Sequence, residues 1–77
     1  MPPIPPSALA NKIVEMIRRR RPDLNAALEE LSRSKEGRSV IAEAFDIAYE
    51  TYVKTARLDD AFEAFVEALE SSIDYDT

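Results

Sequence analysis

The sequence contains no cysteine, no histidine, no tryptophan and a single glycine among its 77 residues. Without cysteine the chain forms no disulfide and offers neither a thiolate nucleophile nor thiolate ligands for zinc. Without histidine it lacks the side chain that most easily titrates near neutral pH, which is also the commonest metal ligand. One glycine excludes the glycine-rich loops that hold phosphates. We therefore expect no enzyme, no catalytic residue, no metal site and no cofactor.

Long apolar runs are also missing. No stretch approaches the ~18 apolar residues of a membrane-spanning helix or the ~7–15 of a secretory signal. Four prolines among the first six residues further exclude a signal helix there. We expect a cytoplasmic protein with no membrane partner.

The remaining composition is that of one small folded domain. Apolar residues make up 45% of the chain and charged residues 32%, which is inside the globular range. Residues 1–6 are predicted to form a Pro-rich flexible arm, residues 7–74 a single helical domain, and residues 75–77 a frayed C-terminus.

Charge is distributed unevenly along the chain. Residues 1–38 hold eight basic and five acidic side chains, a net charge of +3, whereas residues 39–77 hold two basic and ten acidic ones, a net charge of −8. The sum is the overall charge of −5. Such asymmetry indicates a charged partner or contact between copies, or simply a well-solvated surface.

Apolar spacing of helical period predicts two short helices in the first half. The first covers residues 7–21, with Ser7 as its N-cap, and stops because Pro22 disfavours the helical conformation of the preceding residue. The second starts at Asp23, or at Pro22 as its first residue, and runs to about residue 31. Residues 32–38 are polar and contain Gly37, which predicts a break.

A third helix is predicted over residues 39–57, with Ser39 as its N-cap. Its polar residues form one thin stripe: Glu43, Asp46, Glu50, Lys54 and Arg57. The rest is apolar or small, which is typical of a buried central helix. Its apolar surface exceeds what three neighbours cover, so we expect self-association through Ile41, Phe45, Tyr49, Tyr52 and Val53.

A fourth helix follows, with Asp59 and Asp60 at its start and a capping box between Asp60 and Glu63. No segment shows the alternation of a strand. The expected fold is therefore all-α: a small antiparallel helical bundle of about four helices, two short N-terminal ones and then a long helical hairpin.

Two charged groups are candidate partner-binding sites. The acidic face of the fourth helix consists of Asp60, Glu63, Glu67, Glu70 and Asp74. The basic collar at the end of the first helix consists of Arg18, Arg19, Arg20 and Arg21. The acidic face fits a basic protein or the collar of another copy, or is only a solvated surface. The collar either contacts phosphate or an acidic protein, or only complements the negative end of the helix dipole.

The sequence thus predicts a small acidic protein–protein interaction module, an adaptor, inhibitor or assembly protein that forms a homo-oligomer. A first alternative is a nucleic-acid-associated regulator that contacts phosphate through the basic collar, with Arg33, Lys35 and Arg38 as further bases. A second is a carrier protein. Acyl-carrier-like four-helix proteins are modified on a serine at the start of a long helix, a place similar to that of Ser39, but Arg38 and Val40 stand where they have an acid and a leucine.

Overall fold

The computed structural model describes residues 4–74, and the side chains of residues 4–72. Residues 1–3 of the expected arm and residues 75–77 of the expected frayed end lie outside the described part. Four helices make up this part: α1 (Pro6–Arg20), α2 (Pro22–Leu31), α3 (Lys35–Thr55) and α4 (Leu58–Asp74). None of them is long and apolar enough to cross a membrane.

The α1 helix begins at a proline and not at the expected serine cap. Pro5 is the N-cap residue, in an extended conformation and without a side-chain hydrogen bond, and Pro6 is the first helical residue. The prediction of Ser7 as N-cap is therefore wrong. Proline suits the first helical position because its φ is already helical and its missing N–H needs no partner there.

The α1 and α2 helices meet at a one-residue corner. Arg21 lies between them, and its backbone N–H donates to the Ile17 carbonyl at 2.8 Å. Pro22 is the first residue of α2, which confirms the second of the two expected starts. A proline directly after Arg21 forces α2 to start in a new direction.

The α3 helix begins four residues earlier than predicted. Ser34 is its N-cap, and the Ser34 hydroxyl accepts a hydrogen bond from the Gly37 N–H at 2.9 Å. The predictions of a polar linker over residues 32–38, a break at Gly37 and a cap at Ser39 are wrong. Ser34 satisfies a free N–H of the first turn, so the helix starts there and Gly37 belongs to it.

The turn between α3 and α4 lies earlier in the chain than expected. Ala56 has φ 57° and donates its N–H to the Tyr52 carbonyl at 2.7 Å, so α3 ends at Thr55 and not at residue 57. The α4 helix starts at Leu58, which places Asp59 and Asp60 inside its first turn. The predicted capping box is wrong because Asp60 is not the residue before the helix. Both carboxylates still favour the helix by their charge near its N-terminus.

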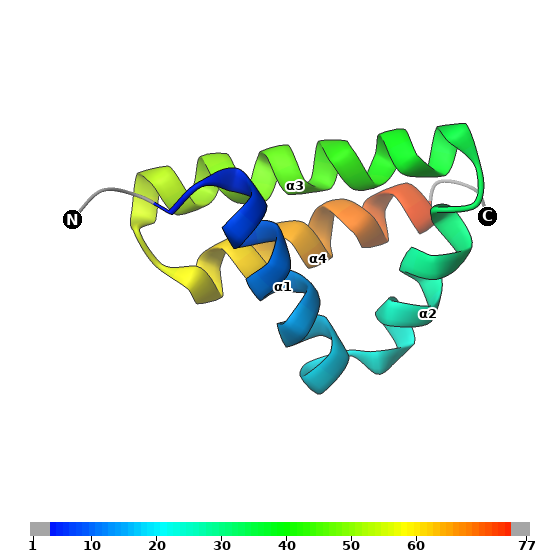
Figure 1. Ribbon diagram of the computed structural model, residues 1–77, viewed down its shortest axis with the longest axis horizontal. Coiled ribbons are helices and arrows are strands. Elements are labelled where there is room, and N and C mark those ends of the chain that lie inside the picture. The colour runs from blue at the N-terminus through cyan, green and yellow to red at the C-terminus, as the bar shows by residue number, and fades with distance from the viewer. Residues whose placement is uncertain (1–3, 75–77) are drawn as a thin grey trace.

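The helices form the expected all-α bundle (Figure 1). The α3 and α4 helices run antiparallel as a hairpin, and α1 and α2 form a V on one side of it. The long dimension of the molecule, 40 Å, follows this hairpin, and the other two are 22 and 18 Å.

The core lies where α1 crosses the hairpin. The α4 helix contributes its apolar stripe to it: Ala61, Phe62, Phe65, Val66 and Leu69. Facing these are Leu9, Ile13 and Ile17 of α1. The rings of Phe45 and Phe65 stack with centroids 4.4 Å apart. The helix at the centre of the core is therefore α4.

The prediction that the third helix is the buried central one is wrong. The side chains that α3 buries fully in the core are two alanines, Ala44 and Ala48, whereas Ile47 is 44% and Val53 58% exposed. Its small residues allow close approach to α4, and its two exposed large apolar side chains lie outside this contact, Ile47 at the border with α4.

Candidate interaction surfaces

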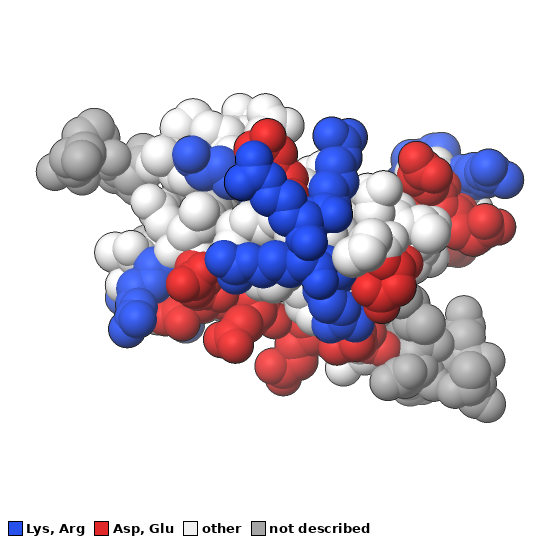
Figure 2. Space-filling model, turned by 90° about the horizontal axis from the view of Figure 1, so that it is seen from below, with Lys and Arg blue, Asp and Glu red and all other residues white. Residues whose placement is uncertain are grey.

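The basic collar and the acidic face lie next to each other in the same chain (Figure 2). On this side of the molecule the basic side chains gather in the middle and acidic ones lie beside them. The α1 helix ends against α4, so that Arg20 and Arg21 lie opposite Glu70 and the first turn of α4. Two surfaces that the sequence treats separately are thus one mixed-charge region.

Arg21 connects three elements. Its Nε and Nη2 donate to the two carboxylate oxygens of Asp23 at 3.2 and 3.1 Å, and Nη2 also donates to Glu70 Oε2 at 3.2 Å. The hydrogen bonds that Arg21 donates to Asp23 and Glu70 raise the pKa of Arg21 above its usual value. The hydrogen bond from Arg21 lowers the pKa of Asp23. This ion-pair group holds the α1–α2 corner against α4.

Arg20 contacts the start of α4 in two ways. Its Nη1 is 3.4 Å from Asp59 Oδ1, and its guanidinium carbon lies 5.5 Å from the centre of the Phe62 ring. Both ion-pair partners are exposed, with 56% and 70% of their side chains accessible, so the pair contributes little stability.

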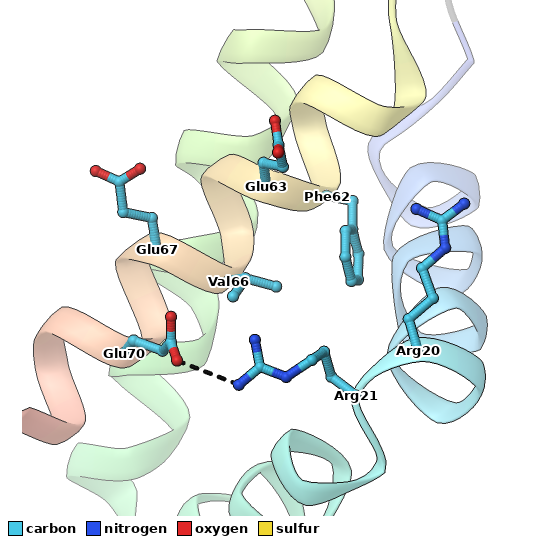
Figure 3. A pocket seen from close by; sticks show the side chains of 7 residues that line it. All are labelled: Arg20, Arg21, Phe62, Glu63, Val66, Glu67 and Glu70. Atoms are coloured by element: carbon cyan, nitrogen blue, oxygen red, sulfur yellow. Dashed lines mark hydrogen bonds and ion pairs between the residues drawn. The ribbon is translucent and has the colours of Figure 1, made fainter.

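A groove of about 490 Å³, open to solvent, lies between these residues (Figure 3). Phe62 and Val66 point into it and form an apolar floor. Glu63 and Glu67 stand on its α4 side, and among the described side chains neither forms an ion pair. The groove is lined by both charge signs and is therefore not a dedicated anion or cation site.

Each predicted charged residue has a definite place. Arg18 and Arg19 are exposed, and no ion pair to them occurs among residues 4–72. Glu70 pairs with Arg21, whereas the side chain of Asp74 lies outside the described part. The sequence reasoning missed Asp23 and Asp59 as partners of the collar. In the sequence, the one indication of the Arg21–Asp23 pair is that Asp23 follows Arg21 by two residues.

The second basic group lies at the other end of α2. Arg33, Lys35 and Arg38 are exposed around the α2–α3 turn, and Arg38 donates to the Ser32 carbonyl at 3.1 Å. The length of α2 separates them from the collar.

The residues expected to drive self-association divide into two sets. Ile41, Phe45, Tyr49 and Tyr52 are half-buried, and the last three pack against the core. The Tyr49 hydroxyl donates to the Ile4 carbonyl at 3.3 Å, which docks the residue before Pro5 onto α3. Val53 is exposed, and so is Ile47, which the sequence reasoning did not include. In the sequence, the indication that Ile47 is exposed is its position next to Asp46, a residue of the polar stripe.

Ser39, the serine of the carrier alternative, is an exposed residue of the second turn of α3. Its side chain makes no hydrogen bond to the described residues, and the capping role belongs to Ser34. Within the described part no cluster of three or more acidic side chains is arranged to hold a metal ion.

Comparison with known proteins adds no relative: no family model, curated protein or solved structure matches the chain. The class that the fold defines is a small all-α bundle.

Proposed function

We propose that this protein is a small protein–protein interaction module, an adaptor, inhibitor or assembly protein, that binds through the outer face of α3. The observation that carries the proposal is the exposure of two large apolar side chains on that face, Ile47 at 44% and Val53 at 58%. Burying such side chains against a partner is favourable, by about 25 cal/mol per Å² of apolar surface.

The pattern of charge and chemistry supports a binding role over a catalytic one. The chain has no cysteine and no histidine, and the pKa shifts found at the collar belong to an ion pair that joins helices. The proposal assigns the protein no catalytic activity and keeps the cytoplasmic location expected from the sequence.

Affinity capture from the native host followed by mass spectrometry tests the proposal. The full chain is compared with the double variant Ile47→Thr/Val53→Thr, which keeps the helix and removes apolar surface. Ala26→Ser on α2, also an exposed apolar position, is the matched control. We expect protein partners with the wild type and the control, and their loss with the double variant. Partners that survive the double variant would place binding elsewhere.

The alternative function is phosphate contact through the basic collar, and it needs a separate test. Arg18 and Arg19 support it because they are exposed, whereas Arg20 and Arg21 are engaged by Asp59, Asp23 and Glu70. Retention on heparin at ~50 mM salt, with a salt slope that flattens after replacement of the four arginines by Gln, would favour this alternative. No retention removes it. A covalent mass increase on Ser39 would instead indicate the carrier function.

A further inference from the structure

The exposed residues of α3 form a continuous stripe along its outer side. The spacing of three and four residues puts them on one face of the helix. The outer stripe of α3 consists of Ser39, Glu43, Asp46, Ile47, Glu50, Val53 and Lys54, and continues to Arg57 just beyond the helix; all of them are exposed.

From this stripe we infer that the partner of α3 is a second copy of the same chain, with the two α3 helices antiparallel. The inference rests on the proposed function, since it names the partner of that surface. The order of charges along the stripe favours this pairing.

Acidic residues occupy one half of the stripe and basic residues the other. Glu43, Asp46 and Glu50 come first, and Lys54 and Arg57 follow. Parallel pairing of two copies would set acid against acid and base against base. Antiparallel pairing sets the acidic half of each copy against the basic half of the other, and like-charge opposition is avoided except at the centre.

The centre of this arrangement lies at Glu50. Asp46 and Lys54 are both four residues from it within the helix. Glu43 precedes it by seven residues, and Arg57 follows it by seven, after the helix has ended. A two-fold axis near Glu50 therefore brings Asp46 of each copy close to Lys54 of the other. It also brings Glu43 toward the other copy's α3 C-terminus, beyond which Arg57 lies. Such an isologous contact is the usual form of a homodimer interface.

The exposed apolar side chains flank the same centre. Ile47 and Val53 are each three residues from Glu50, which is about 4.5 Å along a helix. In the antiparallel pair the apolar side chains of both copies gather near the axis and cover one another. Ile47 also borders a shallow groove between α3 and α4 whose small residues, Ala64 and Ala68, let another helix approach closely.

The size of the contact predicts a weak dimer. The helical part of the shared stripe, residues 43–54, spans roughly 17 Å. One helix pair of that length lies at the low end of specific interfaces, which bury about 1,200–2,000 Å². Its ion pairs are exposed, so added salt, with a Debye length of about 8 Å at physiological strength, weakens the dimer.

Engineered cysteines test the register, because the chain has no cysteine of its own. Under mild oxidation at tens of micromolar we expect Glu50→Cys to form a disulfide-linked dimer, because the two residues meet at the axis. Ser39→Cys is the matched control: it is exposed on the same stripe, but the two copies of residue 39 stand roughly 33 Å apart in the antiparallel pair, too far for a disulfide. Equal crosslinking of both variants, or none of Glu50→Cys, overturns the inference.

Charge exchange provides an independent readout by sedimentation equilibrium. Asp46→Lys and Lys54→Asp should each weaken the dimer about tenfold, since each change affects two symmetry-related pairs. The double variant should regain most of the wild-type affinity because it restores the pairing in reverse. Equal affinities of all four proteins would contradict the antiparallel arrangement.

The two proposals fail in different ways. A wild type that stays monomeric at a hundred micromolar overturns the homodimer. The proposed function still stands in that case if Ile47→Thr/Val53→Thr abolishes capture of a different protein.

Discussion

Gly37 determines how closely α2 and α3 approach each other. It is a buried residue in the first turn of α3, and a Cβ there would meet the Leu31 backbone, 2.6 Å from its carbonyl carbon and 2.8 Å from its Cα. The backbone at Leu31 belongs to the last turn of α2 and cannot move aside without moving the helix. The one glycine of the chain is thus a contact residue and not a helix break.

Gly37→Ala should therefore destabilise the protein, by about 1–3 kcal/mol from overpacking. Helix propensity alone predicts the opposite sign, a gain of about 1 kcal/mol. Urea unfolding of the variant checks the sign. Ser39→Ala, at an exposed position two residues on, is the control and should leave the stability within about 0.5 kcal/mol.

Arg21 is the residue that joins the V of α1 and α2 to the hairpin. It pairs with Asp23 at the start of α2 and with Glu70 near the end of α4. The pKa of Asp23 is lowered by this contact, so ionised Asp23 stabilises the folded state. A lowered folded-state pKa means that this contribution is present above the unfolded pKa of about 3.9 and is lost as the pH falls through the folded value.

Asp23→Asn should for this reason be less stable than the wild type at neutral pH, and the difference should shrink as the pH falls below the unfolded pKa and through the lowered folded-state pKa of Asp23. Urea denaturation of both proteins across this range measures it. Glu15→Gln, an exposed acid of α1, controls for the removal of one negative charge. A difference that stays constant with pH would show that the pair with Arg21 does not contribute.

At the scale of elements, capping hydrogen bonds and turn conformation determine where each helix ends. The spacing of apolar residues does not reveal either of them. Ser34 and Ser39 both precede a stretch of helical period, but the cap bond is made by Ser34 to the Gly37 N–H. The α3–α4 turn closes through Ala56, which has a left-handed conformation although it is not a glycine. A turn this short holds the two long helices antiparallel.

Ser34→Ala should cost about 1 kcal/mol of stability, the usual effect of losing an N-cap. Ser39→Ala removes no N-cap hydrogen bond and raises the helix propensity of the position, so it should be neutral or slightly stabilising. The two variants differ only in position, and thermal unfolding by circular dichroism compares them. An equal loss in both would mean that the helix begins at a different residue.

At the scale of the whole molecule, stability depends on one small core. Phe65 is fully buried at its centre and stacks on Phe45 of α3. Leu9, Ile13 and Ile17 cover the same core from α1. A folded chain of this length has a stability of roughly 4–12 kcal/mol, so one central side chain represents a large part of it.

Phe65→Ala should cost about 3–5 kcal/mol and bring the protein close to unfolding. Phe65→Leu keeps most of the volume and should cost clearly less. Urea unfolding followed by circular dichroism ranks them. Equal stability of the Leu variant and the wild type, with a folded Ala variant, would show that the core repacks without the aromatic stack.

The sequence alone determined the helical class and the number of helices, because apolar spacing and Pro22 act within a few residues of the chain. The tertiary structure decided which face each helix buries. The third helix has apolar residues on most sides, and α4 selected the face with Ala44 and Ala48 because small side chains allow the closest packing, which left Ile47 and Val53 outside. It also decided the partners of the basic collar: Arg21 and Glu70 are 49 residues apart, and no local pattern joins residues at that separation.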